Sequence, residues 1–255
     1  MRIFPLIFLL AFSAHAQFTR TSAFVAASQP RASAASFNPT NDIWTVYSDY
    51  WPENFTTNGS IVSLTDSWSG KDLRNSAAST GGQKKDSRLD GHPVMSYDGS
   101  TQFFTNLVNS IAPPFEIWMA VCVSNFNVVN PILWVDSAGS GSENYLYRNS
   151  GSYATVGGSF AAWQTNEWVL LNWQVLNTGT GTNAIWTNGV VAQSVQGTVA
   201  TQNSLMLGRL IGATRHLQFL HGRILIYQGK IPGTNATGRS DVRAWFTNYY
   251  PTLTH

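Results

Sequence analysis

The sequence has 255 residues, with 15 basic and 13 acidic side chains, a formal net charge of +2 and a charged fraction of 11%. This composition argues against nucleic-acid binding, which needs basic clusters facing phosphates, and against disorder, because 43% of the residues are hydrophobic and 13% aromatic. Uncharged polarity replaces charge, since 81 residues are Ser, Thr, Asn or Gln, as is typical of a β-rich secreted domain.

The first 16 residues have the three parts of a secretory signal peptide. Arg2 precedes an apolar run over residues 3–12, and the small residues Ala14 and Ala16 then form an A-x-A cleavage pattern. The run is far shorter than the roughly 20 residues that span a bilayer, which argues against a membrane anchor. We therefore expect cleavage after Ala16 and a secreted or periplasmic, extracellular protein without a membrane span.

Residues 17–41 are rich in Ala, Ser and Thr with little apolar periodicity, so we expect a linker or a loosely attached arm. Over residues 42–250, short apolar or alternating runs are separated by Gly, Asn, Ser and Pro, which is typical of a β-sandwich or barrel. No internal repeat divides this region, and we expect one domain with a tail at 251–255.

Ten runs predict β-strands, because apolar residues alternate or continue between turn signals. Two turns support their spacing: Asn188-Gly189 tolerates the positive φ of a type I′ hairpin, and Asp98-Gly99 gives a similar signal. The predicted strands are 61–64, 93–97, 115–123, 132–135, 145–148, 168–176, 182–186, 190–194, 204–207 and 222–227.

Near the C-terminus the apolar period changes to that of a helix, which predicts one short amphipathic helix packed on the sheets. Ser240 or Thr237 is expected to cap its N-terminus, and Pro251 to end it. The apolar positions are Val242, Trp245, Phe246 and Tyr249.

Cys122 is the single cysteine, so an intrachain disulfide cannot form even in an oxidising compartment. It lies in the apolar segment 115–123, where we expect a buried small side chain rather than a nucleophile. Stability must therefore come from the core.

Four stretches stand in a characteristic order: 58–73 with the turn Asp66-Ser67-Trp68-Ser69-Gly70, 91–99 with an Asp-Gly turn, 166–171 with the 186–189 hairpin, and 219–227 followed by 239–250. In this order and spacing they resemble the laminin-G-like, concanavalin A-like lectin/glucanase jelly roll, in particular the single-domain bacterial and phage type. The resemblance covers about residues 42–250 and implies an all-β fold, a sandwich of two antiparallel sheets with one short C-terminal helix. It further implies carbohydrate binding, adhesion or, in some branches, polysaccharide cleavage, among which a fold does not choose.

The glucanases of this fold carry a strand of the Glu-x-Asp-x-Glu type, which places carboxylates on one face for retaining hydrolysis. Here the nearest acid pairs are Asp49/Glu53 and Asp86/Asp90, in loop-like polar segments, so a glycosidase is disfavoured. Lyases of related jelly rolls use Arg, Gln or His, and Tyr on a concave sheet. Arg148 with Tyr147 and a distant His216 or His221 leaves that alternative open.

No phosphate-binding glycine loop, nucleophile elbow or zinc-ligand set is present, so no cofactor is predicted. Calcium is a possible cofactor by resemblance to laminin-G and lectin relatives. The loop at 136–144 has suitable Asp, Glu and Asn side chains, but hydrophilic loops commonly have this composition, and no ligand is assigned.

Aromatic side chains are the remaining indication of a binding site, because sugar sites stack pyranose rings on Trp or Tyr. Trp51 and Trp163 lie in loop-like contexts and are the candidate ligand-binding tryptophans, with Tyr147 and Arg148 as further candidates. The alternative for each aromatic is ordinary packing. Core packing is expected for the tryptophans in predicted strands or the helix, which are Trp118, Trp134, Trp168, Trp173, Trp186 and Trp245.

The sequence thus favours a secreted, non-catalytic lectin-like domain that binds a glycan or an extracellular surface protein. One alternative is a polysaccharide-active hydrolase or lyase whose catalytic groups come from separate strands. The other is a structural adhesion or envelope protein with no binding groove. The oligomeric state is left open, as is glycosylation at Asn54, Asn58 and Asn235, which begin N-x-S/T sequons.

Overall fold

The computed structural model describes residues 38, 44–75, 79–106, 110–124, 130–136, 144–149, 152–155, 160–162, 166–176, 179–199, 204–209 and 216–254. The chain divides into two units, Met1–Phe37 and Asn38–His255, and the described residues belong to the second. The expected signal peptide and almost all of the expected arm lie outside them.

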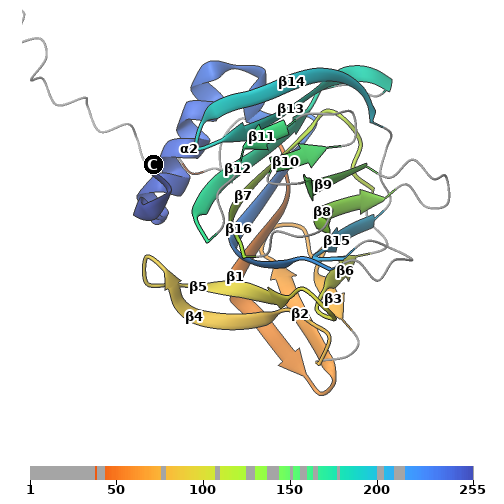
Figure 1. Cartoon of the computed structure of the whole chain (residues 1–255), viewed down its shortest axis with the longest axis vertical. Coiled ribbons are helices and arrows are strands. Elements are labelled where there is room, and N and C mark those ends of the chain that lie inside the picture. The colour runs from red at the N-terminus through yellow and green to blue at the C-terminus, as the bar shows by residue number, and fades with distance from the viewer. Residues whose placement is uncertain are drawn as a thin grey trace, which may run out of the picture. The chain divides into compact units, whose positions relative to one another are not determined.

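The described part of the second unit consists of sixteen β-strands and one α-helix with short 3-10 turns beside it (Figure 1). The strands are β1 Val46–Asn58, β2 Ile61–Asp66, β3 Leu73–Asn75, β4 Gln83–Leu89, β5 His92–Asp98, β6 Phe104–Asn106, β7 Phe115–Val123, β8 Asn130–Asp136, β9 Asn144–Asn149, β10 Ser152–Thr155, β11 Phe160–Ala162, β12 Trp168–Val175, β13 Gly179–Thr187, β14 Val190–Val199, β15 Ser204–Leu207 and β16 Gln218–Gln228. They are followed by η1 Pro232–Thr234, α2 Ala236–Tyr249 and η2 Pro251–Thr254. Among the described residues, no helix is long and apolar enough to cross a membrane.

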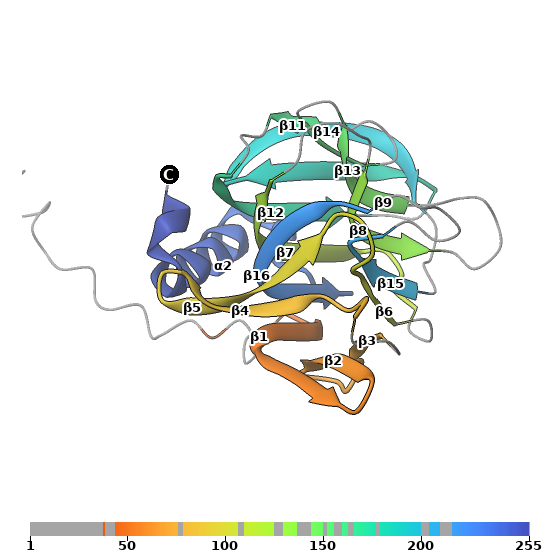
Figure 2. The same cartoon turned by 60° about the horizontal axis from the view of Figure 1, so that its bottom comes forward.

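Every pairing between these strands is antiparallel, so the domain belongs to the all-β class. The strands follow one hydrogen-bonded path in the order β11, β10, β9, β8, β15, β6, β3, β2, β1, β16, β7, β12, β13, β14, and the β4–β5 hairpin pairs with β16 at its side. The path curls on itself, because β10 and β11 at one end lie against β13 and β14 at the other (Figure 2).

Strand β1 carries this path around a bend. Residues 46–50 pair with β16 and residues 55–58 pair with β2, with a register shift between Tyr50 and Phe55. Trp51 lies in this bend, within a strand, and not in the loop that its sequence context suggested. The alternation of the strand breaks at the bend, which explains why no strand was predicted there.

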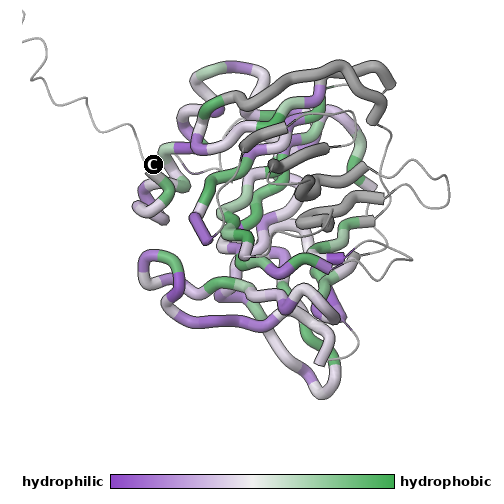
Figure 3. Tube along the Cα trace, viewed as in Figure 1, coloured by the Kyte–Doolittle hydropathy of each residue, from purple (hydrophilic) through white to green (hydrophobic). Residues whose placement is uncertain are grey.

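The central strands β7, β12 and β16 are buried on both faces, and Figure 3 shows hydrophobic residues along these strands. Alternate residues of β7, from Phe115 to Val123, enter the hydrophobic core together with Trp173 of β12. The opposite face is covered by α2, where Phe246 stacks on Trp118 with ring centroids 6.3 Å apart. Cys122 is buried as expected, and burial raises the pKa of its thiol to about 11.

Helix α2 forms where the sequence predicts a helix, and Val242 and Phe246 are buried in it. Its N-cap, however, is Asn235, whose side chain accepts a hydrogen bond from the Gly238 N–H at 2.6 Å. The expected caps Thr237 and Ser240 are wrong because the helix begins at Ala236, ahead of both.

The end of the chain, expected to be a tail, packs on the domain. Residues 251–254 form η2, Leu253 is buried, and the Thr252 N–H donates to the Asp90 carboxylate at 2.9 Å. Pro251 begins this turn after the helix ends, as the sequence predicts.

Two aspartates fix the turns that carry the family resemblance. Burial acts to raise the pKa of Asp66, but the hydrogen bonds that it accepts outweigh this effect and bring the pKa below its ordinary value. The donors are Ser69 and the backbone N–H groups of Asp49, Trp68 and Lys71. Asp98 accepts the backbone N–H groups of Ser100, Thr101 and Gln102, and these bonds likewise hold its pKa well below the usual range. Both carboxylates replace the missing backbone partners of a tight turn.

Each of the ten predicted strands has a counterpart in the structure. Six further strands were not predicted, namely β1, β3, β4, β6, β10 and β11. Strand β4 reads QKKDSRL and is exposed at every residue except Leu89, so it has no apolar face for the pattern to reveal.

Candidate ligand-binding site

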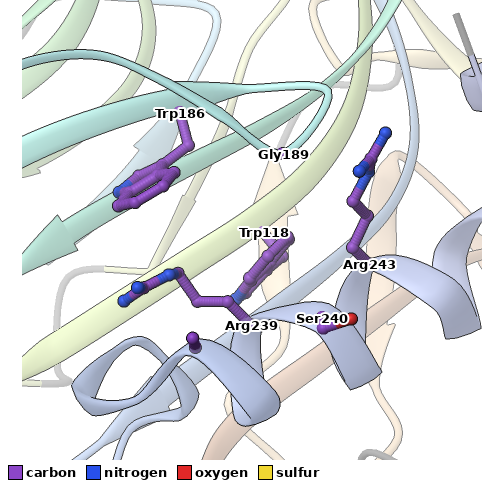
Figure 4. A pocket seen from close by; sticks show the side chains of 7 residues that line it. Trp118, Trp186, Gly189, Arg239, Ser240 and Arg243 are labelled. Carbon is purple, nitrogen blue, oxygen red and sulfur yellow. The ribbon is translucent and has the colours of Figure 1, made fainter.

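A cavity of about 220 Å³ lies between the β13–β14 hairpin and helix α2 (Figure 4). Trp118 of β7 and Trp186 of β13 supply its aromatic surface, and Arg239 and Arg243 of α2 supply its charge. The remaining lining residues are Gly189, Ala236 and Ser240. None of the seven is acidic, so the cavity combines aromatic and cationic surface.

The hairpin over the cavity is the Asn188-Gly189 turn that the sequence predicts, with φ of 48° and 82°. Asn188 ties it to β12, because its N–H donates to the Leu170 carbonyl at 2.9 Å and its side-chain oxygen accepts from the Leu170 N–H at 2.8 Å. A Cβ on Gly189 would lie 2.5 Å from Cδ of Arg243. The glycine therefore lets the Arg243 side chain lie against the turn.

Helical spacing places the two arginines on the same side of α2. Arg239 and Arg243 are four residues apart, so they lie side by side on the helix, next to the buried Val242 and Phe246, which follow them by three positions each. Figure 4 shows Arg239 reaching beneath Trp186 and Arg243 rising toward Gly189. The helix thus presents both cations to the cavity at the border of the apolar face that packs on the sheet.

Arg239 is held in place by its neighbours. Its guanidinium lies 4.4 Å from the centroid of the Trp186 ring, a cation–π contact, and it donates a hydrogen bond to the Gly233 carbonyl. Arg243 differs, because among the described residues its guanidinium has no hydrogen bond or ion pair. One cation of the cavity is therefore fixed, and the other is available.

A buried carboxylate stands behind the cavity. Glu116 precedes Trp118 by two residues on the same face of β7, and it accepts hydrogen bonds from the Gly233 N–H at 2.6 Å and the Asn172 amide at 2.8 Å. Burial raises its pKa to about 7, although these two bonds and the charge of Arg239 act to lower it. Its charge therefore changes near neutral pH, next to Arg239.

The backbone of Gly233 connects these two charged residues, since its N–H donates to Glu116 and its carbonyl accepts from Arg239. A Cβ at this position would lie 1.9 Å from Nε2 of Gln174 and 2.9 Å from Oε1 of Glu116. Glycine is required at this position because the chain passes directly over both side chains.

A shallower groove of about 270 Å³ continues from the cavity along α2. It shares Ser240 and Arg243 with the cavity and extends to Ala244 and Thr247. An occupant of the cavity could therefore extend past Arg243 along the helix surface.

Trp51, predicted to bind ligand, belongs to a separate aromatic cluster. Its ring and that of Trp245 enclose the Arg223 guanidinium, whose Cζ lies 3.7 Å and 4.0 Å from the two centroids. Asp49 pairs with Arg223 through two contacts of 2.5 Å and also accepts the Trp51 indole N–H at 2.8 Å. Trp51 is half-buried, so most of its contacts are internal.

The other predicted site residues are placed only in part. Tyr147 and Arg148 lie on β9, where they pair with Pro131 and Asn130 of β8, and nothing is described of their side chains. Trp163 lies outside the described residues. These three positions stay predictions.

The lyase alternative rests on Arg148 with Tyr147 and His216 or His221, and it stays untested because nothing is described of the side chains of Arg148 and Tyr147. The aromatic cluster contains a different arginine, histidine and tyrosine. His92 stacks on Tyr249 at 4.0 Å, and Tyr249 donates to Glu53 at 3.1 Å. Burial and the adjacent Glu53 raise the pKa of Tyr249 to about 12, so it stays protonated at neutral pH. Arg223 is enclosed by the tryptophans and engaged by Asp49, which leaves it unable to neutralise a substrate.

The acid pairs that stand nearest in sequence also have separate structural partners. Asp49 pairs with Arg223 and Glu53 accepts from Tyr249, while Asp90 binds Thr252. Among the described residues, no group of three His, Cys, Asp or Glu side chains could hold a metal ion. The loop considered for calcium lies mostly outside the described residues.

Sequence reasoning assigned Trp118 and Trp186 to the core and singled out neither Arg239 nor Arg243 as a site residue. Trp118 is indeed buried, but Trp186 is only partly so and lines the cavity. The available signal was the pair of arginines four residues apart, beside the apolar stripe of the predicted helix.

No family model and no curated protein matches the sequence. Solved structures do match. The sialidase of Trypanosoma rangeli in complex with sialic acid superposes with a TM-score of 0.61 at 11% identity, over 94% of this chain and 39% of that one. The same sialidase without a named ligand gives 0.57 at 13% identity, over 95% and 40%. The receptor-binding domain of botulinum neurotoxin type G gives only 0.44 at 14% identity, over 78% and 51%.

The chain thus spans about two fifths of the length of the sialidase that it matches. At these identities the similarity concerns the fold alone, and it agrees with an all-β antiparallel domain.

Proposed function

We propose that this protein is a secreted, non-catalytic carbohydrate-binding domain, a concanavalin A-like jelly roll of two sheets, which takes up a sugar between Trp186 and helix α2. The observation that carries the proposal is the cavity of about 220 Å³ with two tryptophans and two arginines in its wall.

The two-sheet interpretation is supported by the bend in β1. On one side of the bend, the path runs through β16, β7 and β12 to β14, and on the other through β2 and β6 to β11. The two ends lie against each other, and residues from both branches, such as Leu64 and Trp173, share one hydrophobic core. This is how two sheets of a sandwich pack face to face.

A carbohydrate suits the cavity because of its size and chemistry. The volume is below the roughly 300 Å³ at which pockets for drug-sized ligands begin, so it has room for one small ring. Trp186 offers aromatic surface for the apolar face of a sugar, and the hydroxyl of Ser240 can hydrogen-bond sugar hydroxyl groups. The similarity to a sialidase fold supports the same class of ligand.

Binding without turnover is proposed because the described groups around the cavity do not form an acid–base pair. Glu116 is held by Gly233 and Asn172 behind Trp118, and no other acid lines the cavity. Most glycosidases, retaining or inverting, use two carboxyl groups facing the scissile bond.

The predicted signal peptide supports secretion, and the expected partner is a glycan or an extracellular surface protein. Trp163, Tyr147 and Arg148 stay candidates for a second contact on the chain from β8 to β11. Calcium stays a possible cofactor through the 136–144 loop.

The proposal is tested by a glycan array on the secreted protein, with calcium and with chelator. We expect saturable binding to one glycan class, lost in Trp186→Ala. Trp68→Ala is the matched control, because Trp68 is 49% exposed in the turn after β2 and lines neither the cavity nor the groove.

A folded protein that binds no glycan in either condition would refute carbohydrate binding and favour an adhesion or envelope role. Turnover of a polysaccharide would refute the non-catalytic assignment. Binding that survives in Trp186→Ala but is lost in Trp163→Ala would move the site to the strands near β9.

A further inference from the structure

We infer that the cavity selects an acidic sugar, a ring that bears a carboxylate or a sulfate, and that Arg243 is the residue that binds the acidic group. The inference rests on the proposed carbohydrate-binding function and names the class of its ligand.

The first argument is the charge of the cavity. Two guanidinium groups line it, and none of its described lining residues is acidic. A neutral sugar needs no such charge, because hydroxyl groups are satisfied by uncharged donors and acceptors. An anion, in contrast, gains charge-assisted hydrogen bonds that are shorter and about twice as strong as neutral ones.

The second argument is that like charges four residues apart on a helix repel each other. Arg239 and Arg243 stand at this spacing. Asp241 lies between them in sequence, but two positions away from each it does not share their face. An anion bound beside both would relieve the repulsion, which favours a negatively charged occupant of the cavity.

The third argument separates the roles of the two arginines. Arg239 is already engaged by the Trp186 ring and the Gly233 carbonyl, so it forms part of the wall. Arg243 has no hydrogen-bond or ion-pair partner among the described residues, and its stem is seated against Gly189. Its planar fork can therefore bind a carboxylate or sulfate through two parallel hydrogen bonds.

The fourth argument concerns the rest of the ligand. Arg243 and Ser240 belong both to the cavity and to the groove that runs on to Thr247. A sugar ring beside Trp186 with its acidic group at Arg243 would leave this groove for the next residue of a chain. The ligand is thus best described as an acidic unit of a polysaccharide.

The experiment titrates the secreted protein with four probes, D-glucuronate, D-glucose 6-sulfate, D-glucose and inorganic sulfate, by isothermal titration calorimetry at low ionic strength. We expect both acidic sugars to bind at least tenfold more tightly than glucose or sulfate. Arg243→Gln should abolish this preference, and Arg243→Lys should retain part of it because the charge remains without the fork. Arg88→Gln, on the exposed face of β4, is the matched control.

The outcomes distinguish the inference from the function on which it rests. Equal affinity for glucose and glucuronate, with loss in Trp186→Ala, would overturn the acidic selectivity and keep carbohydrate binding. Sulfate that binds as tightly as the sulfated sugar would also overturn it, because the sugar ring would then not be recognised. A preference that persists in a folded Arg243→Gln variant would remove Arg243 from the site. Absence of binding to all four probes and to the glycan array would overturn both proposals.

Discussion

Replacing Asp49 by Asn should destabilise this protein more than almost any other isosteric change. Asp49 and Arg223 are 4% and 2% exposed at their side chains and form a bidentate ion pair at 2.5 Å. The substitution keeps the shape of the side chain but leaves the Arg223 guanidinium buried between Trp51 and Trp245 without a counter-charge.

Breaking a buried pair in this way costs roughly 3 to 5 kcal/mol, a large part of the about 5 to 15 kcal/mol that stabilises a typical domain. The cation–π contacts with the two tryptophans place the effect toward the lower end, because they continue to stabilise the charge. Urea denaturation followed by tryptophan fluorescence measures the free energy of unfolding.

Two comparisons make the result specific. Arg74→Gln breaks the ion pair with Asp72, and because Arg74 is 66% exposed it should cost less than about 1 kcal/mol. The double variant Asp49→Leu with Arg223→Met leaves no buried charge and should lie within about 2 kcal/mol of the wild type. If Asp49→Asn cost less than 1 kcal/mol, or the double variant were the less stable of the two, the buried pair would not be what holds β1 on β16.

Three further predictions concern pH and the turn over the cavity. His221 is fully buried, and burial lowers its pKa to about 4. Its neutral side chain therefore contributes about 3 kcal/mol to the free energy of unfolding, which is complete above pH 6.5 and is lost as the pH falls to 4. Urea titrations of Glu116→Gln, in which the opposing titration of Glu116 is removed, should reveal this loss. Burial raises the pKa of Glu116 to about 7, so its protonated side chain makes a similar contribution to the free energy of unfolding, complete below pH 4.5 and lost as the pH rises through 7. The variant His221→Gln, which keeps only the Glu116 effect, should therefore be less stable at pH 8 than at pH 5. If both variants instead keep the pH profile of the wild type, these two groups do not carry the opposing effects. Gly189→Ala should cost about 1 kcal/mol or more, since φ is 82°, and should weaken acidic-sugar binding by displacing Arg243; unchanged affinity in titration calorimetry would contradict this.

The sequence alone determined those parts of the fold in which each element carries its own signal. The segment 115–123 is apolar except for Glu116 and is buried on both faces, and Asn188-Gly189 forms its turn because two residues must adopt positive φ. The C-terminal helix follows in the same way from the spacing of Val242 and Phe246. In each of these elements, the residue pattern that is visible in the sequence is the same feature that makes the strand, turn or helix form.

Elements without such a signal appeared only in the tertiary structure. Strand β4 is exposed at every residue except Leu89, and β1 loses its alternation at the bend between Tyr50 and Phe55. The helix cap was misplaced because Asn235, Thr237 and Ser240 are all suitable caps, and packing decided where the helix begins.

The candidate site was decided by tertiary structure almost entirely. Trp118, Trp186 and Arg243 come from a central strand, a hairpin and the terminal helix, so no spacing in the sequence brings them together. Trp51 was predicted to bind ligand from its loop-like sequence context, yet in the structure it packs on the buried Arg223, which lies 172 positions further along the chain. Local patterns report which residues are buried in a strand or helix, whereas a binding site depends on which surfaces the folded chain leaves facing each other.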